Sequence, residues 1–225
     1  MRKTVFANDE HYHIYNRGTD KREVFADEKD YHKFLLCLDL LNDEDAGLMA
    51  LWRDLHKKTA AGFPKVQPWA SPRLNLRKPL VSIIAYCLNP NHYHFILKQK
   101  EDRGIEKFMQ KLGTSYTMYF NKKYSRSGVL FQGRFKAIHI TSNEYLLYLS
   151  AYVNGNNFIH KYNKDMEAWP YASYLDYVGK RDGKLCDKEI ILGQFDNDFS
   201  QYTKYIRDNA QYLKEKKEME KYALE

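Results

Sequence analysis

Two histidines separated by one residue, His92 and His94, have the spacing that best suits metal binding in this sequence. On a β-strand, residues two apart point to the same face, so both imidazoles can approach one cation. A second pair with the same spacing, His11 and His13, lies near the N-terminus. The sequence leaves open whether the two pairs share a site or only one pair binds a metal.

Two histidines do not complete a metal site, so a third ligand is expected elsewhere. Tyr152 and Asn156 are four residues apart in a segment with helical periodicity, which places them on one helix face. A phenol and a carboxamide side by side can reach the same metal-bound phosphate. Tyr145 and Tyr148 lie on neighbouring faces, and spacing alone does not choose the nucleophile among these tyrosines.

The elements that position these side chains alternate between strands and helices. The first helix is expected to begin at Asp27 or Asp30, and the helix that carries Tyr152 at Ser142 or Asn143. The segments 80–88 and 92–98 read as a hairpin in the sheet centre. The pattern predicts strands at 11–16, 80–88, 92–98 and 129–140 (the last a strand or a hairpin arm), and helices at 27–41, 105–120 and 142–156. This order indicates an α+β fold with a central, mainly antiparallel β-sheet and helices packed on it.

Two stretches interrupt or follow this pattern. Four of the six prolines fall within about residues 43–79, which we interpret as a long surface insertion. After Lys180 we expect two short helices and a Lys/Glu-rich end that frays.

The composition favours an anionic partner. The net charge is +7, and nineteen tyrosines and twelve phenylalanines among many basic residues suit stacking on unpaired bases. No apolar run is long enough for a membrane span, and the N-terminus lacks the apolar core of a signal peptide, so a cytoplasmic location is expected. Three widely spaced cysteines without a CxxC pair argue against a disulfide framework or a zinc ribbon.

Several segments resemble one known family in order and spacing. The segment from Ala85 to Phe95, with Asn89-Pro90-Asn91-His92-Tyr93-His94, looks like the signature of HUH-type single-tyrosine transposases. The resemblance extends from about residue 11 to 178 and is strongest for the REP-associated tyrosine transposases. It also involves Tyr15 to Gly18, Gly128 to Lys136, Tyr145 to Asn156 and Trp169 to Tyr174.

This resemblance implies a ferredoxin-like fold over residues 1–178, followed by a helical C-terminal extension at 179–225. It also implies a metal-dependent single-stranded DNA endonuclease and strand transferase that forms a 5′-phosphotyrosine. Carried over residue by residue, His92 and His94 are metal ligands, Tyr152 is the nucleophile and Asn156 is a candidate third ligand. The metal is expected to be Mg²⁺ or Mn²⁺.

The chain departs from the family pattern at three positions. Asn154 replaces a histidine and Asn157 a proline in the helix motif, whereas Asn89 stands where a methionine is usual. We expect Asn89 to affect only the turn. The other two changes keep open an alternative function, a domesticated hairpin-DNA-binding module with little or no cleavage. An RNA-binding protein is a third possibility.

Substrate capture is assigned to basic and aromatic residues around the predicted site. The partner is single-stranded or hairpin DNA, and the protein is expected to act as a monomer or homodimer. His11 and His13 can support the metal ligands from behind or face the DNA, and of these readings and a plain place on the sheet surface we prefer the last. The candidate DNA-binding residues are Asn16, Arg17, Lys122, Lys123, Arg126, Phe131, Arg134 and Lys136.

Overall fold

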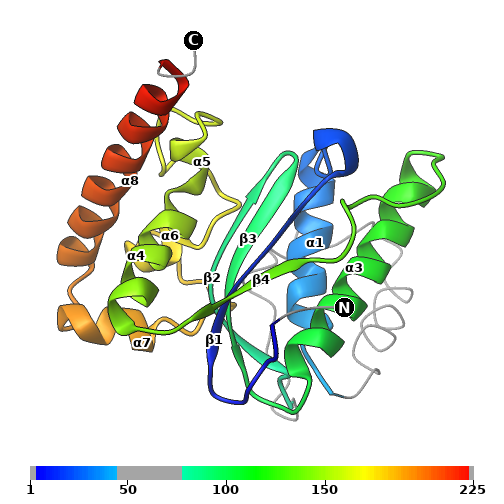
Figure 1. The fold of residues 1–225 in the computed structure, drawn as a ribbon, viewed down its shortest axis with the longest axis horizontal. Helices are drawn as coiled ribbons and strands as arrows, with labels where there is room; N and C mark the ends of the chain where they lie inside the picture. Colours follow the sequence, from blue (N-terminus) through cyan, green and yellow to red (C-terminus); the bar gives the residue numbers. More distant parts are fainter. Residues whose placement is uncertain (1–3, 45–77, 223–225) are drawn as a thin grey trace.

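The computed structural model describes residues 4–44 and 78–222 (Figure 1). Most of the predicted insertion at 43–79 lies outside the described residues. The strands are β1 (His11–Arg17), β2 (Val81–Asn89), β3 (His92–Gln99) and β4 (Lys136–Ile140). The helices are η1 (Thr19–Lys21), α1 (Glu28–Leu40), α3 (Gly104–Lys123), α4 (Asn143–Asn154), α5 (Asn156–Ile159), α6 (Tyr174–Tyr177), α7 (Glu189–Leu192), η3 (Gly193–Phe195) and α8 (Phe199–Tyr222).

The four strands form one sheet in the order β2-β3-β1-β4, with every neighbouring pair antiparallel. This order, with α1 between β1 and β2 and α3 between β3 and β4, is the ferredoxin-like arrangement. The predicted α+β fold is therefore confirmed. In the register, Arg17 pairs with His92 and Tyr15 with both His94 and Lys136, so the end of β1 lies beside the histidine pair.

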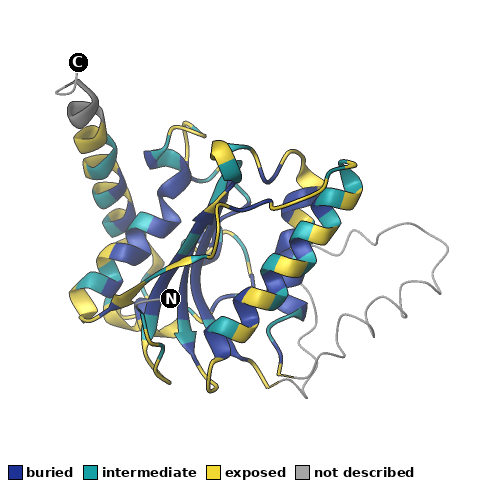
Figure 2. Ribbon diagram, turned by 45° about the vertical axis from the view of Figure 1, so that its right-hand side comes forward, coloured by how far each residue is buried: buried dark blue, intermediate teal, exposed yellow. Residues whose placement is uncertain are grey.

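Helices cover both faces of the sheet. Figure 1 shows α1 and α3 on one side and α4, α5, α6 and α8 on the other, and Figure 2 shows the buried strands between them. Alternation along β3 explains the two layers, because Tyr93, Phe95 and Leu97 join the core under α1 and α3. His94 and Ile96 point to the opposite face, where Ile96 joins the core under α4 and α8. The histidine pair thus lies on the α4 face.

The caps of α1 and α4 follow the sequence. Asp27 caps α1, and a reciprocal capping box with Asp30 satisfies backbone donors at its first turn. Ser142 caps α4 by accepting from the Tyr145 backbone. The helix ends at Asn154, two residues earlier than predicted, and Gly155 joins it to α5. A Cβ at Gly155 would lie 2.7 Å from the Ala210 side chain, so glycine allows α8 to pack closely here.

Three further expectations need correction. The hairpin of β2 and β3 exists, but β2 is an edge strand of the sheet, partly covered by residues 171–173 through the bridge between Cys87 and Ala172. The predicted strand at 129–140 is regular only from Lys136, because Gly128 and Gly133 turn the chain with φ values of 83° and 68°. The C-terminal segment was expected to contain short helices and a fraying end, but α8 is a helix of 24 residues that continues through Tyr222. Over the described residues, no helix combines the length and apolar character that a membrane crossing requires.

Candidate active site

A cavity of about 390 Å³ opens at the end of β3 that carries the histidine pair. Strands β1 and β3, the loops that follow β1 and β2, and helix α4 all contribute to its wall. It therefore brings together segments that are far apart in the sequence. Its lining residues are Tyr15, Asn16, Arg17, Lys21, Asn91, His92, His94, Gln132, Lys136, Tyr152, His160 and Tyr162.

His92 is held with one ring nitrogen protonated and the other, Nε2, presenting its lone pair to Asn89. Asn91 donates through Nδ2 to the Lys21 carbonyl at 3.2 Å, so its Oδ1 faces His92 Nδ1 at 2.6 Å. The Nδ1 atom must therefore carry the proton, which leaves a lone pair on Nε2. That Nε2 lies 3.2 Å from Asn156 Oδ1. Burial lowers the pKa of His92 to about 4, which keeps the imidazole neutral.

His94 lies deeper and is supported from behind by another histidine. His94 Nδ1 is 2.8 Å from His13 Nε2, and the rings of His94 and His92 have centroids 5.3 Å apart. Burial lowers the pKa values of His94 and His13, the latter to about 4. The expectation that His13 is a sheet-surface residue was wrong, because its side chain is buried against His94. His11 is half-buried and does not line the cavity.

Tyr152 is the tyrosine of α4 that faces the cavity. Its ring centroid lies 5.5 Å from that of His94, in an edge-to-face arrangement. Burial raises the pKa of the Tyr152 phenol, and a hydrogen bond with Asn156 partly offsets this increase. Spacing alone did not choose the nucleophile among the three tyrosines of this helix. Tyr145 and Tyr148 are not among the cavity-lining residues.

The donor set fits a hard divalent cation with some nitrogen character. It comprises two neutral imidazoles and the Asn156 carboxamide oxygen, which is buried beside His92. Ligands of an octahedral cation at about 2.1 Å are separated by about 3 Å, close to the Asn156–His92 distance. No group of three His, Cys, Asp or Glu side chains suited to a metal occurs in the part of the chain that the structure describes.

The departures at Asn154 and Asn157 lie away from the cavity lining. Asn154 is fully buried, accepts from Ser173 Oγ at 2.6 Å and donates to the Tyr202 hydroxyl at 3.2 Å. It ties α4 to α8 and to the loop before α6. Asn157 is also buried. The expectation that Asn89 affects only the turn was wrong, because its side chain contacts both His92 and Asn156.

The predicted DNA-binding residues fall into separate regions. Asn16, Arg17 and Lys136 line the cavity with the histidine pair. Phe131 and Arg134, together with Asn16, line a neighbouring cavity of about 750 Å³ beside α3. Phe131 packs in the core, with its ring 5.5 Å from that of Tyr93.

The remaining three, Lys122, Lys123 and Arg126, lie at the end of α3, on the opposite face of the sheet from α4. Lys123 forms ion pairs of 2.6 Å with both Asp27 and Asp30. Lys123 therefore has a structural partner at the start of α1.

The cavity also contains residues that the sequence did not single out. Tyr15 stacks on His94 with centroids 5.6 Å apart, and Tyr162 donates to Asn91 Oδ1 at 3.0 Å. The ring of His160 lies 5.1 Å from that of His92, and Lys217 of α8 contacts His160 Nδ1 at 2.8 Å. The one signal for His160 is its position four residues after Asn156, which continues the same helix face.

Part of the chain is similar to a known protein family. Residues 75–156 match the family model described as "Transposase IS200 like". No curated protein matches the chain. One similar solved structure is described as "Structure of the REP associates tyrosine transposase bound to a REP hairpin". The match covers 84% of this chain and 97% of the other chain, with a TM-score of 0.48 and 11% identity. Residues 75–156, which include the histidine pair, Tyr152 and Asn156, are therefore similar to IS200-like transposases.

Proposed function

We propose that the protein is a metal-dependent single-stranded DNA endonuclease and strand transferase with Tyr152 as its nucleophile. The observation that carries this proposal is the convergence of His92, His94 and Tyr152 on one cavity, with Asn156 in contact with His92. His92, His94 and Asn156 would hold Mg²⁺ or Mn²⁺, which polarises the scissile phosphate and stabilises charge on the leaving oxygen.

The residues of the chain account for the remaining chemistry. The Tyr152 oxygen attacks phosphorus and loses its proton, while the bond from phosphorus to the 3′ oxygen breaks and that oxygen takes up a proton. The products are a 5′-phosphotyrosine and a free 3′-OH. A 3′-OH from another strand can attack this linkage in reverse, which releases Tyr152 and joins the strands. The covalent bond conserves the energy of the phosphodiester, so no nucleotide cofactor is required.

The walls of the cavity suit an unpaired strand. Arg17, Lys21 and Lys136 supply positive charge for phosphates. Tyr15 and Tyr162 offer rings on which bases can stack. A duplex presents its bases already stacked and paired, so rings in a cavity of this size favour a single strand.

The test is covalent capture of DNA. Purified protein is incubated with labelled single-stranded hairpin oligonucleotides from its own genomic flanks, with Mg²⁺, Mn²⁺ or EDTA, and resolved on a denaturing gel. We expect a slower protein–DNA band that requires metal and disappears in Tyr152→Phe and His92→Ala. Tyr148→Phe is the matched control, because Tyr148 is 37% exposed on the same helix. An adduct that persists in Tyr152→Phe would exclude this tyrosine as nucleophile, and binding without any adduct would indicate a DNA-binding module.

A further inference from the structure

Asn89, at the end of β2, places its carboxamide beside His92 and Asn156, two of the three proposed metal ligands. The residue is fully buried, although it ends an edge strand beside a turn. Its Nδ2 atom lies 2.6 Å from Asn156 Oδ1 and 3.0 Å from His92 Nε2. Since Asn156 Oδ1 and His92 Nε2 are themselves 3.2 Å apart, the three atoms form a closed triangle.

The dimensions of this triangle match one face of an octahedral metal site. Ligands at about 2.1 Å from Mg²⁺ or slightly further from Mn²⁺ lie about 3 Å from one another. The three measured separations, 2.6, 3.0 and 3.2 Å, bracket that value. Three atoms from three segments, β2, β3 and α5, would therefore need only small shifts to share one cation.

The hydrogen bonds at this point indicate a place for positive charge. His92 Nε2 carries a lone pair, because its Nδ1 proton is directed to Asn91, and Asn156 presents an oxygen. Both are acceptors that point at the same group, the NH₂ of Asn89. Two convergent acceptors held by a donor that carries partial positive charge are the arrangement that a cation replaces.

Asn89 can itself become a ligand by turning its carboxamide. Rotation by half a turn about the Cβ–Cγ bond exchanges the positions of oxygen and NH₂. The contact that the oxygen gives up is with Cys87 Sγ at 3.7 Å, a weak sulfur donor. The turn therefore sacrifices little and brings a hard oxygen ligand toward His92 and Asn156.

We propose that Asn89 is a further ligand of the metal ion, through its side-chain oxygen, in addition to His92, His94 and Asn156. This inference rests on the proposed function, in which those three residues bind Mg²⁺ or Mn²⁺. It assigns the carboxamide a role in the metal site rather than in the turn. The site then has two imidazoles and two amide oxygens, and the added oxygen ligand suits Mg²⁺ and Mn²⁺.

The test is a titration of the full chain with Mn²⁺ in the absence of DNA. Binding is measured as the loss of the free Mn²⁺ signal in electron paramagnetic resonance. Asn89→Leu removes the oxygen and is expected to weaken Mn²⁺ binding roughly tenfold or more. Asn89→Asp keeps the shape and adds a charged oxygen, so it is expected to bind Mn²⁺ more tightly than wild type. Gln132→Glu, which adds the same charge to the cavity wall away from the three atoms, is the matched control for a general charge effect.

Each outcome bears on Asn89 separately from the overall function. If Asn89 only donates hydrogen bonds to its neighbours, Asn89→Asp and Asn89→Leu will both weaken binding, which would overturn the proposal. A gain in Asn89→Asp that exceeds the gain in Gln132→Glu cannot arise from misfolding and would support it. If wild type binds Mn²⁺ in this way but forms no DNA adduct, the ligand assignment stands and the endonuclease proposal fails. If wild type forms the adduct and Asn89→Leu binds Mn²⁺ like wild type, the endonuclease proposal stands and the ligand assignment fails.

Discussion

At the scale of single residues, the contact between His13 and His94 determines which ring nitrogen His94 would offer to a metal in the proposed site. Only one of two neutral imidazoles can donate in a hydrogen bond between ring nitrogens, here 2.8 Å long. If His94 directs a lone pair on Nε2 into the cavity, its Nδ1 carries the proton and donates a hydrogen bond to His13 Nε2. His13 then fixes the ring orientation and tautomer of a ligand without touching the cation. Burial, which lowers the pKa of His13 to about 4, preserves its acceptor nitrogen.

This arrangement predicts that the acceptor at position 13 matters for metal affinity. His13→Phe keeps a planar ring but removes the acceptor, and we expect Mn²⁺ binding to weaken about tenfold. His13→Gln can present an oxygen to His94 Nδ1 and should recover much of that loss. Mn²⁺ titration of the two variants, with thermal unfolding as a check on the fold, measures the effect. Equal affinity in wild type and His13→Phe would show that His94 does not depend on His13.

At the scale of elements, the basic residues of β4 and α3 face different neighbours. Lys136 on β4 lines the cavity, and its ammonium lies 5.8 Å from the Tyr15 ring centroid. Lys123 at the end of α3 is bound to Asp27 and to the buried Asp30. A lysine already paired with two carboxylates has little charge left for a phosphate, whereas Lys136 is exposed beside the proposed path of the strand.

We therefore predict that two lysine substitutions affect different quantities, DNA binding in one case and stability in the other. Lys136→Met should weaken single-stranded DNA binding and reduce the slope of log affinity against log salt by about 1. Lys123→Met should leave that slope unchanged but lower the free energy of unfolding by about 2–3 kcal/mol, because buried Asp30 loses its cation. Fluorescence anisotropy at several salt concentrations and urea unfolding measure the two quantities. If Lys123→Met also reduced the slope of log affinity against log salt, the DNA strand would have to contact the α3 side as well.

The elements themselves were largely predictable, and the details of the site were not. Periodicity located the histidine strand and the helix with Tyr152, and Ser142, one of the two candidate caps, precedes the start of that helix. Its end at Asn154 was missed because the close contact of Gly155 with Ala210 joins residues far apart in the sequence. His13 was misplaced for a similar reason: alternation shows which residues share a face, but not which helix covers that face. Asn89 contacts Asn156 because α5 approaches the end of β2. The sequence around Asn89 alone does not show that approach.

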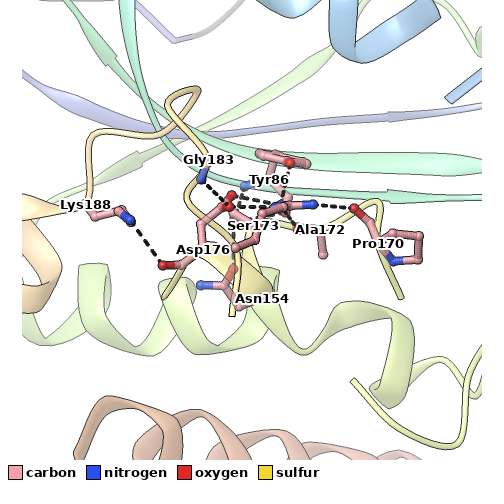
Figure 3. A network of polar contacts seen from close by, with 9 residues as sticks. Tyr86, Asn154, Pro170, Ala172, Ser173, Asp176, Gly183 and Lys188 are labelled. Atoms are coloured by element: carbon pink, nitrogen blue, oxygen red, sulfur yellow. Dashed lines mark hydrogen bonds and ion pairs between the residues drawn. The ribbon is translucent and has the colours of Figure 1, made fainter. Parts of the chain in front are cut away.

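At the scale of the whole molecule, buried polar groups join the segment 170–188 to the sheet and to α4 (Figure 3). Asp176 is fully buried and paired with Arg181, which donates to the carbonyls of Pro170 and Ala172 and to the Tyr86 hydroxyl. Ser173 bonds to Tyr86 of β2, and its hydroxyl also reaches Asn154. The helix that carries Tyr152 is thus held in place partly by residues after it in the chain. This explains how Asn154 can serve the fold while it lies away from the cavity lining.

The last prediction concerns this network. Arg181→Met removes the cation from buried Asp176 and leaves two carbonyls and the Tyr86 hydroxyl without their donor, so we expect the free energy of unfolding to fall by about 3–5 kcal/mol. Arg207→Met is the matched control, because Arg207 is itself exposed, pairs with a partly exposed Glu167 and should contribute under about 1 kcal/mol. Urea unfolding followed by circular dichroism measures both. Equal losses in the two variants would mean that the buried pair contributes no more than a surface one, and that packing of α8 alone holds α4 against the sheet.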